Sequence, residues 1–208
     1  MVNQLRYALR ASLRVHTLRY RKKMPTIHKI LADVETSIDE ASCHYEIWWA
    51  LGSANRQHYS EILKSERYGW FLESTQIAHL VAMLMSLARL FDSHEDSSSC
   101  VKSLKKVLDQ ENRHELTQLI EGKMKPHQNL VKRVLDIRCK LMAHTDSRET
   151  DVEVFNRNGT TPKEIKNLIA DAKQVFGEVA WKLNIRNRSY TTGIHEDSTI
   201  KVLEKLKL

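Results

Sequence analysis

Glycine and cysteine are scarce in this chain, and each shortage argues against a class of site. The 208 residues include only 6 glycines, and no glycine-rich nucleotide-binding motif occurs. The 3 cysteines, Cys43, Cys100 and Cys139, are odd in number and show no CxxC spacing. Neither a disulfide framework nor a zinc site is therefore indicated. This cysteine content is typical of a reducing compartment, so we expect a cytoplasmic protein.

Metal-binding patterns and long apolar runs are also missing. There are 10 histidines, but no HExxH motif and no Cys/His cluster occurs, and His94 lies in a serine-rich polar segment. We therefore expect neither a metal nor a cofactor. No apolar run approaches the ~18 uncharged residues that span a membrane. A hydrophobic content of 41% with 28% charged residues is typical of a soluble globular protein.

The net charge of +7 arises entirely from the first 23 residues. This leader contains seven basic residues and no acidic one, and the rest of the chain contains 26 basic and 26 acidic residues. Three interpretations are open: an arm that binds RNA or a membrane surface, a targeting peptide, or a translated region upstream of a true start at Met24. We favour the third, because helical periodicity begins just after Met24.

Apolar residues at helical spacing predict an all-α bundle. The central helix, over residues 70–91, is apolar nearly all round and should pack on several sides, with Trp70 and Phe71 in the core. Other helices are expected over residues 27–51, 101–109, 112–121, 127–144 and 162–184.

Capping patterns mark where two of these helices begin. Thr161 and Glu164 have capping-box spacing with a proline between them at the first helical position, and Asn112 and Glu115 have similar spacing. The segment up to Asn158-Gly159 is expected to form an irregular insert or a small hairpin. We divide the chain into a leader (residues 1–23), a helical domain (24–184), and a linker with an extra C-terminal helix (185–208).

The segment DIRCKLMAH, residues 136–144, carries two polar residues on the apolar side of its predicted helix. One apolar row leads to His144, and a parallel row contains Arg138; the rows consist of Leu130, Val134, Ile137 and Leu141, and of Val131, Leu135 and Met142. Arg133 belongs to the outward, solvated face. A buried arginine paired with a carboxylate, and a histidine at a helix C-terminus, would be a purely structural explanation.

The spacing of Arg138 and His144 limits what one copy of the chain can do. Six residues place the two side chains about 120° apart and ~9 Å along the helix. One copy therefore cannot easily direct both groups at one reacting atom. Two copies could, because a two-fold axis sets the same surface against itself.

These residues and their context resemble the HEPN superfamily. Arg138-x5-His144 near the end of an apolar helix is similar to its R-x(4–6)-H signature. The segments ALG, WFLESTQIAHLVAMLMSLARLFD, SSSCVKSLKKVL and MAHTD resemble the abortive-infection U-type, AbiU2-like branch over roughly residues 24–184. The resemblance implies an all-α HEPN-like bundle, a homodimer, and metal-independent RNA cleavage at a site built from both subunits.

The resemblance also implies roles for individual residues. His144 would exchange protons during cleavage, and Arg138 would stabilise the charged phosphoryl oxygens. Asp92 and Asp146 are candidates to orient them. Cys139 departs from the family pattern, in which a small polar residue follows the arginine, and a thiol is a poor hydrogen bonder.

We therefore expect an HEPN-type endoribonuclease of a phage-defence or toxin–antitoxin system, which cleaves RNA to leave 2′,3′-cyclic phosphates. A cognate antitoxin or other partner protein is also expected, and a membrane is not. Cys139 and the neutral body favour an alternative, a non-catalytic module that binds RNA or a partner protein. A third reading is a structural dimer through the stripe from Ile27 to Trp48.

Overall fold

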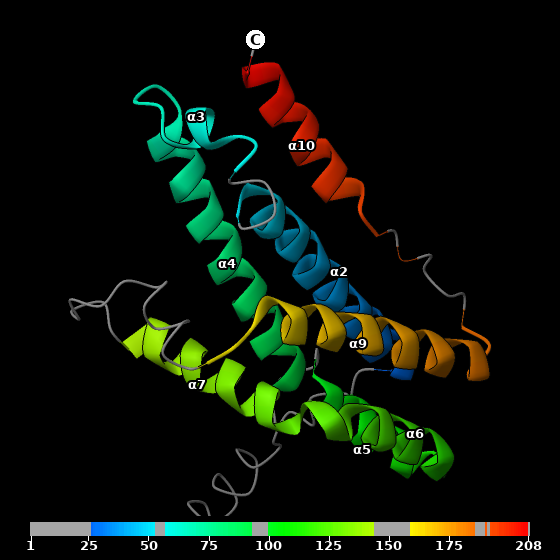
Figure 1. Ribbon diagram of the computed structural model, residues 1–208. Coiled ribbons are helices and arrows are strands. Elements are labelled where there is room, and N and C mark those ends of the chain that lie inside the picture. Colours follow the sequence, from blue (N-terminus) through cyan, green and yellow to red (C-terminus); the bar gives the residue numbers. More distant parts are fainter. Residues whose placement is uncertain are drawn as a thin grey trace, which may run out of the picture.

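The computed structural model confirms the all-α prediction for the part of the chain that it describes (Figure 1). It describes residues 26–52, 57–92, 100–143, 159–185, 190 and 192–207, with residues 140–143 described by their backbone alone. The helices are α2 (Ile27–Leu51), α3 (Ser60–Leu63), α4 (Gly69–Phe91), α5 (Val101–Gln110), α6 (His114–Met124), the 3-10 helix η1 (Lys125–His127), α7 (Gln128–Ala143), α9 (Pro162–Lys182) and α10 (Ile194–Leu206). The expected hairpin before Gly159 lies outside the described residues.

Two long helices, α2 and α4, form the centre of the fold and make the most extensive contact between described helices (Figure 1). The apolar side chains of their inner faces are at most 1% exposed: Ile30, Leu31, Val34 and Ile38 on α2, and Met83, Leu84 and Leu87 on α4. Burying one such side chain contributes about 1.5–3 kcal/mol. This core therefore fixes the direction of α4 and the position of its C-terminal end in the bundle.

Both ends of α2 follow from local chemistry. Thr26 Oγ1 accepts a hydrogen bond from the Lys29 N–H at 3.4 Å, as expected of an N-cap. Gly52 follows the last turn and lies against α4. A Cβ there would be 2.7 Å from Gln76 Nε2 and 3.0 Å from the Trp48 carbonyl oxygen. Glycine therefore leaves room for the Gln76 side chain of α4 beside the end of α2.

One predicted capping box is confirmed and the other is wrong. The Glu164 N–H donates to Thr161 Oγ1 and the Thr161 N–H donates to the Glu164 carboxylate, which closes the start of α9. By contrast, α6 begins at His114 without a side-chain cap. Asn112 instead adopts a left-handed φ of 57° and ends the preceding helix, a conformation that asparagine tolerates. The left-handed conformation of Asn112 lets the chain change direction within the short connection between α5 and α6.

Trp70 and Phe71, which the sequence placed in the core, are 79% and 69% exposed. The first turn of α4 packs mainly through Leu72, which belongs to a small apolar cluster apart from the main core. The other buried members of that cluster are Leu51, Tyr59, Ile62 and Leu203. The prediction was wrong because the apolar pattern continues past the point where neighbouring helices cover α4.

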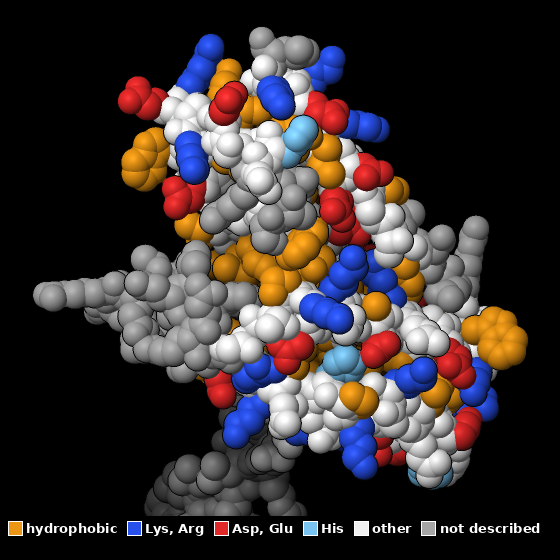
Figure 2. All heavy atoms as spheres, viewed as in Figure 1, with side chains coloured by type: hydrophobic (Ala, Val, Ile, Leu, Met, Phe, Trp, Pro, Cys, Tyr) orange, Lys and Arg blue, Asp and Glu red, His pale blue; other side chains and the backbone are white. Residues whose placement is uncertain are grey.

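By length and composition, α4 could cross a membrane, and no other described helix could. A core helix of a soluble protein has the same composition, and the inner face of α4 is buried among other helices. On the face shown in Figure 2, basic and acidic side chains are interspersed, in agreement with a neutral body.

The C-terminal helix α10 packs along α2 (Figure 1). The buried Glu46 carboxylate accepts hydrogen bonds from the N–H groups of Gly193 at 2.8 Å and His195 at 3.1 Å. A carboxylate is favourable at a helix N-terminus, where backbone N–H groups lack partners. Leu203 is fully buried further along. The expected extra helix is therefore part of the packed structure.

Two histidines contact each other across the α2–α4 interface. His44 Nδ1 and His79 Nδ1 are 2.8 Å apart, so one ring donates a proton and the other accepts it. Burial lowers the pKa of both rings, and the charge of His44 lowers the pKa of His79 further. The nearby Glu40 raises the pKa of His44, and His195 lowers it. The pair is therefore suited to the neutral form.

Arg133 joins α7 to the start of α9, which corrects its assignment to a solvated face. Its Nη1 donates to the Gly159 carbonyl and its Nη2 to Glu164 Oε1, both at 2.6 Å. The Thr161 N–H first, and Arg133 next, lower the pKa of the Glu164 carboxyl. The carboxylate that caps α9 thus also ties this helix to α7.

We predict that the stability of the protein falls as the pH drops below about 6.5, the pKa of an unperturbed histidine. The folded chain holds His44 and His79 below this value, so the unfolded chain binds more protons and acid favours unfolding. Thermal unfolding at about pH 7.5 and about pH 5.5 measures this loss. His79→Gln should reduce it, and the exposed His28→Gln should not; equal losses in wild type and His79→Gln would contradict the prediction.

We also predict that Arg133→Ala lowers the free energy of unfolding by about 1–2 kcal/mol, the range for a charge-assisted hydrogen-bond pair that is partly exposed. Urea titration measures this change. The neighbouring, exposed Lys132 supplies the matched control, and Lys132→Ala should change stability by less than about 0.5 kcal/mol. Equal effects of the two substitutions would refute the tie between α7 and α9.

Candidate functional site

Arg138 lies at the edge of the core on α7. The row Leu130, Val134 and Ile137 is buried, as predicted, and the parallel row Val131 and Leu135 is half-buried against it. Arg138 continues the half-buried row, and its side chain is 26% exposed. The guanidinium is therefore on the inward side of α7 while remaining accessible to a ligand.

Asp92 comes to Arg138 from a different helix. It is the residue that ends α4, and the packing of α7 on α4 brings its Oδ2 to 3.3 Å from Arg138 Nη1. The aspartate side chain is 14% exposed, so solvent screens this ion pair less than one on the open surface. An arginine carries several N–H donors in a planar fork. One ion pair therefore fixes the guanidinium while leaving it donor capacity for an anion.

The structure thus brings together two of the five predicted site residues. The sequence made Asp92 a candidate to orient the signature residues. It could not show that Asp92 contacts Arg138, because 46 residues separate the two. The ion pair itself is also what a purely structural arginine would make. What distinguishes this arginine is its position at an accessible edge.

Cys139 follows Arg138 but faces away from the core. Its thiol is exposed, whereas the preceding Ile137 is fully buried. In the described structure the side chain that forms an ion pair with Arg138 is that of Asp92, although Cys139 is its neighbour in the sequence. The role of Cys139 at the site stays a prediction.

His144 and Asp146, the other two predicted residues, lie outside the described residues. The described backbone of α7 extends to Ala143, the residue directly before His144. Among the described residues, no group of three or more His, Cys, Asp or Glu side chains could hold a metal ion. The site geometry therefore consists of a positioned cation and its carboxylate partner.

Comparison with protein families gives a match to AbiU2, the HEPN AbiU2 model, over residues 24–201. Comparisons with curated proteins and with solved structures gave no match. The matched segment runs from just before α2 into α10, and thus extends beyond residue 184, where the resemblance seen in the sequence ended. It contains the apolar helix with Arg138 and the helix that ends at Asp92. The chain therefore belongs to the HEPN AbiU2 family, an abortive-infection family.

Proposed function

We propose that this protein is a metal-independent endoribonuclease that acts in the cytoplasm in bacterial defence against phage. The observation that supports this most is the placement of Arg138. Arg138, the arginine of the segment that resembles the R-x(4–6)-H pattern, lies at an accessible edge, and the Asp92 carboxylate from a second helix forms an ion pair with it. His144, the signature histidine, follows the last described residue of the same helix.

The proposed reaction is transesterification within RNA. The ribose 2′-oxygen attacks the adjacent phosphorus, the P–O2′ bond forms and the P–O5′ bond breaks. A base must take the proton of the 2′-hydroxyl, and an acid must give one to the departing 5′-oxygen. Histidine can do both near neutral pH. The products carry a 2′,3′-cyclic phosphate and a 5′-hydroxyl.

Arg138 would stabilise the charge that develops on the phosphoryl oxygens. A guanidinium donates two parallel hydrogen bonds to a phosphate, and it stays charged at any physiological pH. Its contact with Asp92 orients it before substrate binds, so less reorganisation is needed in the transition state. Asp92 is thus a positioning residue, and Asp146 is proposed to act similarly on His144.

The complete site is proposed to form in a homodimer. On one continuous helix, Arg138 and His144 would be about 120° and ~9 Å apart, too far to contact one phosphate together easily. A two-fold axis beside α7 would bring the arginine of one subunit to the histidine of its partner. A cognate antitoxin that covers this edge would restrain the activity.

Cys139, a poor hydrogen bonder where the family pattern has a small polar residue, and the neutral body favour one alternative, a non-catalytic family member that binds RNA or a partner protein. Here the bundle would keep its Arg138–Asp92 pair as a binding feature. Cleavage assays separate the two functions, because the alternative predicts binding without product.

We predict that the purified full chain cleaves single-stranded RNA in the presence of a chelator and leaves 2′,3′-cyclic phosphate ends. His144→Ala and Arg138→Ala should each slow cleavage about 10²–10³-fold, the range for loss of one catalytic or oxyanion-stabilising group. Denaturing gels and end-group analysis measure both. Arg67→Ala, at an exposed arginine between α3 and α4, should cleave like wild type. Undiminished cleavage by His144→Ala would sink the proposal.

We predict in addition that the two inactive variants complement each other. A heterodimer of Arg138→Ala and His144→Ala subunits keeps one intact arginine and one intact histidine, and these meet only if the site spans both chains. Equal mixing after reversible dissociation should restore about a quarter of wild-type activity, since half of the dimers then hold one of two sites. A mixture as inactive as its components would argue against the shared site.

A further inference from the structure

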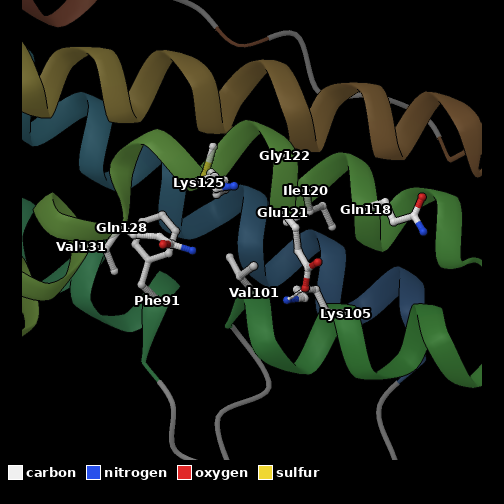
Figure 3. Close-up of a pocket in the computed structure, with 11 residues that line it drawn as sticks. Phe91, Val101, Lys105, Gln118, Ile120, Glu121, Gly122, Lys125, Gln128 and Val131 are labelled. Atoms are coloured by element: carbon white, nitrogen blue, oxygen red, sulfur yellow. Dashed lines mark hydrogen bonds and ion pairs between the residues drawn. The ribbon is translucent and has the colours of Figure 1, made fainter.

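A groove of about 660 Å³ runs between α5, α6 and the start of α7 (Figure 3). Its floor is apolar and includes the buried Val101, Ile120 and Met124. Its rim carries polar and charged side chains from the same helices. An apolar floor with a few polar groups at its edge is typical of a site that binds a small molecule or a small group of a larger ligand.

Two lysines, Lys105 on α5 and Lys125 after α6, give the groove a positive rim. Glu121 forms an ion pair with Lys105, and Figure 3 shows the two side chains pointing toward each other across the groove. Lys125 is exposed. The lining therefore has an excess of positive charge.

The surrounding segment has the same bias. Residues 101–131, which span α5, α6 and the first turn of α7, contain six Lys or Arg and four Asp or Glu. The chain beyond the leader is neutral as a whole, so this is a local concentration of positive charge. A phosphate-bearing ligand is the partner that such a segment attracts.

One end of the groove leads to the candidate site. Phe91, Gln128 and Val131 gather at this end (Figure 3). Phe91 directly precedes Asp92. Val131 lies on the same half-buried row as Arg138, two turns and ~10 Å earlier along α7. A chain that crosses Arg138 can therefore continue into the groove.

We propose that this groove binds a nucleotide next to the cleaved phosphodiester of a single-stranded RNA. The base packs on the apolar floor beside Phe91, where the Gln128 amide can hydrogen-bond to its edge. Lys105 and Lys125 contact the backbone phosphates, with Lys105 exchanging Glu121 for a phosphate. Stacking on an aromatic ring combined with lysine contacts is how proteins hold single strands without strict sequence preference. The inference rests on the proposed function for its choice of ligand.

Gly122 makes the groove testable without damage to the fold. It lines the groove from α6, and a Cβ added there would meet no atom within 4 Å. A side chain at this position therefore enters open space. Replacing a helical glycine also favours the helix. Gly122→Trp should fill the groove, and Gly122→Ala should leave it open.

The experiment measures binding of a fluorescent, 2′-O-methylated single-stranded RNA to the full-length chain. This probe cannot be cleaved, because the attacking hydroxyl is blocked, so binding is separated from catalysis. We expect Gly122→Trp to bind about 5- to 150-fold more weakly than wild type, the loss that corresponds to one base stack. Gly122→Ala should bind within about twofold of wild type.

A charge test runs in parallel. The double variant Lys105→Gln/Lys125→Gln should weaken binding and lower the slope of log K against log salt by about 1.4, or about 0.7 per lost phosphate contact. The control Lys163→Gln/Lys166→Gln removes the same charge from exposed positions on α9, outside the groove. Its slope should match that of wild type.

Three outcomes overturn the inference: wild type that binds no RNA, wild-type affinity in a folded Gly122→Trp variant, or an unchanged salt slope in the Lys105/Lys125 variant. Thermal unfolding shows whether the Gly122→Trp variant is folded. If it is not, the salt slope of the Lys105→Gln/Lys125→Gln variant decides whether the groove binds RNA. Cleavage of unmodified RNA is assayed separately. Absent cleavage with the expected binding pattern would refute the nuclease and leave the groove assignment intact. Normal cleavage by wild type, combined with RNA binding that neither the Gly122→Trp nor the lysine variant changes, would refute the groove assignment and leave the proposed nuclease intact.

Discussion

The apolar contact between α2 and α4 is the most extensive contact between described helices, and it sets the position of the candidate site. Fully buried aliphatic side chains face each other along it. Among the described helices, α3, α5, α7, α9 and α10 contact α2 or α4, and α6 packs on α5 and α9. The course of α4 determines where Asp92 lies, and α7 packs on α4 with Arg138 opposite that carboxylate. The position of Arg138 beside Asp92 therefore follows from core packing, because a densely packed interior allows few alternative arrangements.

Polar contacts fix the outer helices on this core. Arg133 and the Glu164 cap hold α9 to α7, and Glu46 holds the N-terminus of α10 to α2. Each uses one carboxylate to satisfy backbone N–H groups at a helix start, which are otherwise without partners. The bundle is therefore joined by a few charged groups at its helix ends in addition to its apolar interior.

Much of the fold could be predicted from the sequence, because helix periodicity and capping are local. The bounds of α2, α4 and α5 were predicted closely, and so was the Thr161–Glu164 capping box. The failures share one cause. Trp70, Asn112 and Arg133 have local patterns that suit a core residue, a cap and a solvated cation, and their true environments depend on which neighbouring helix reaches them.

Helix periodicity and residue spacing were enough to predict the helices and to single out Arg138 and His144 as a pair that resembles the R-x(4–6)-H pattern. Three features became visible only in the packed structure: the Asp92 carboxylate beside Arg138, the outward position of Cys139, and the lysine-rimmed groove between α5, α6 and α7. The difference lies in the distance along the chain over which each kind of interaction acts. Backbone propensity and side-chain spacing act within a few residues, whereas an ion pair between residues 92 and 138, or a groove between three helices, exists only after packing has brought distant segments together.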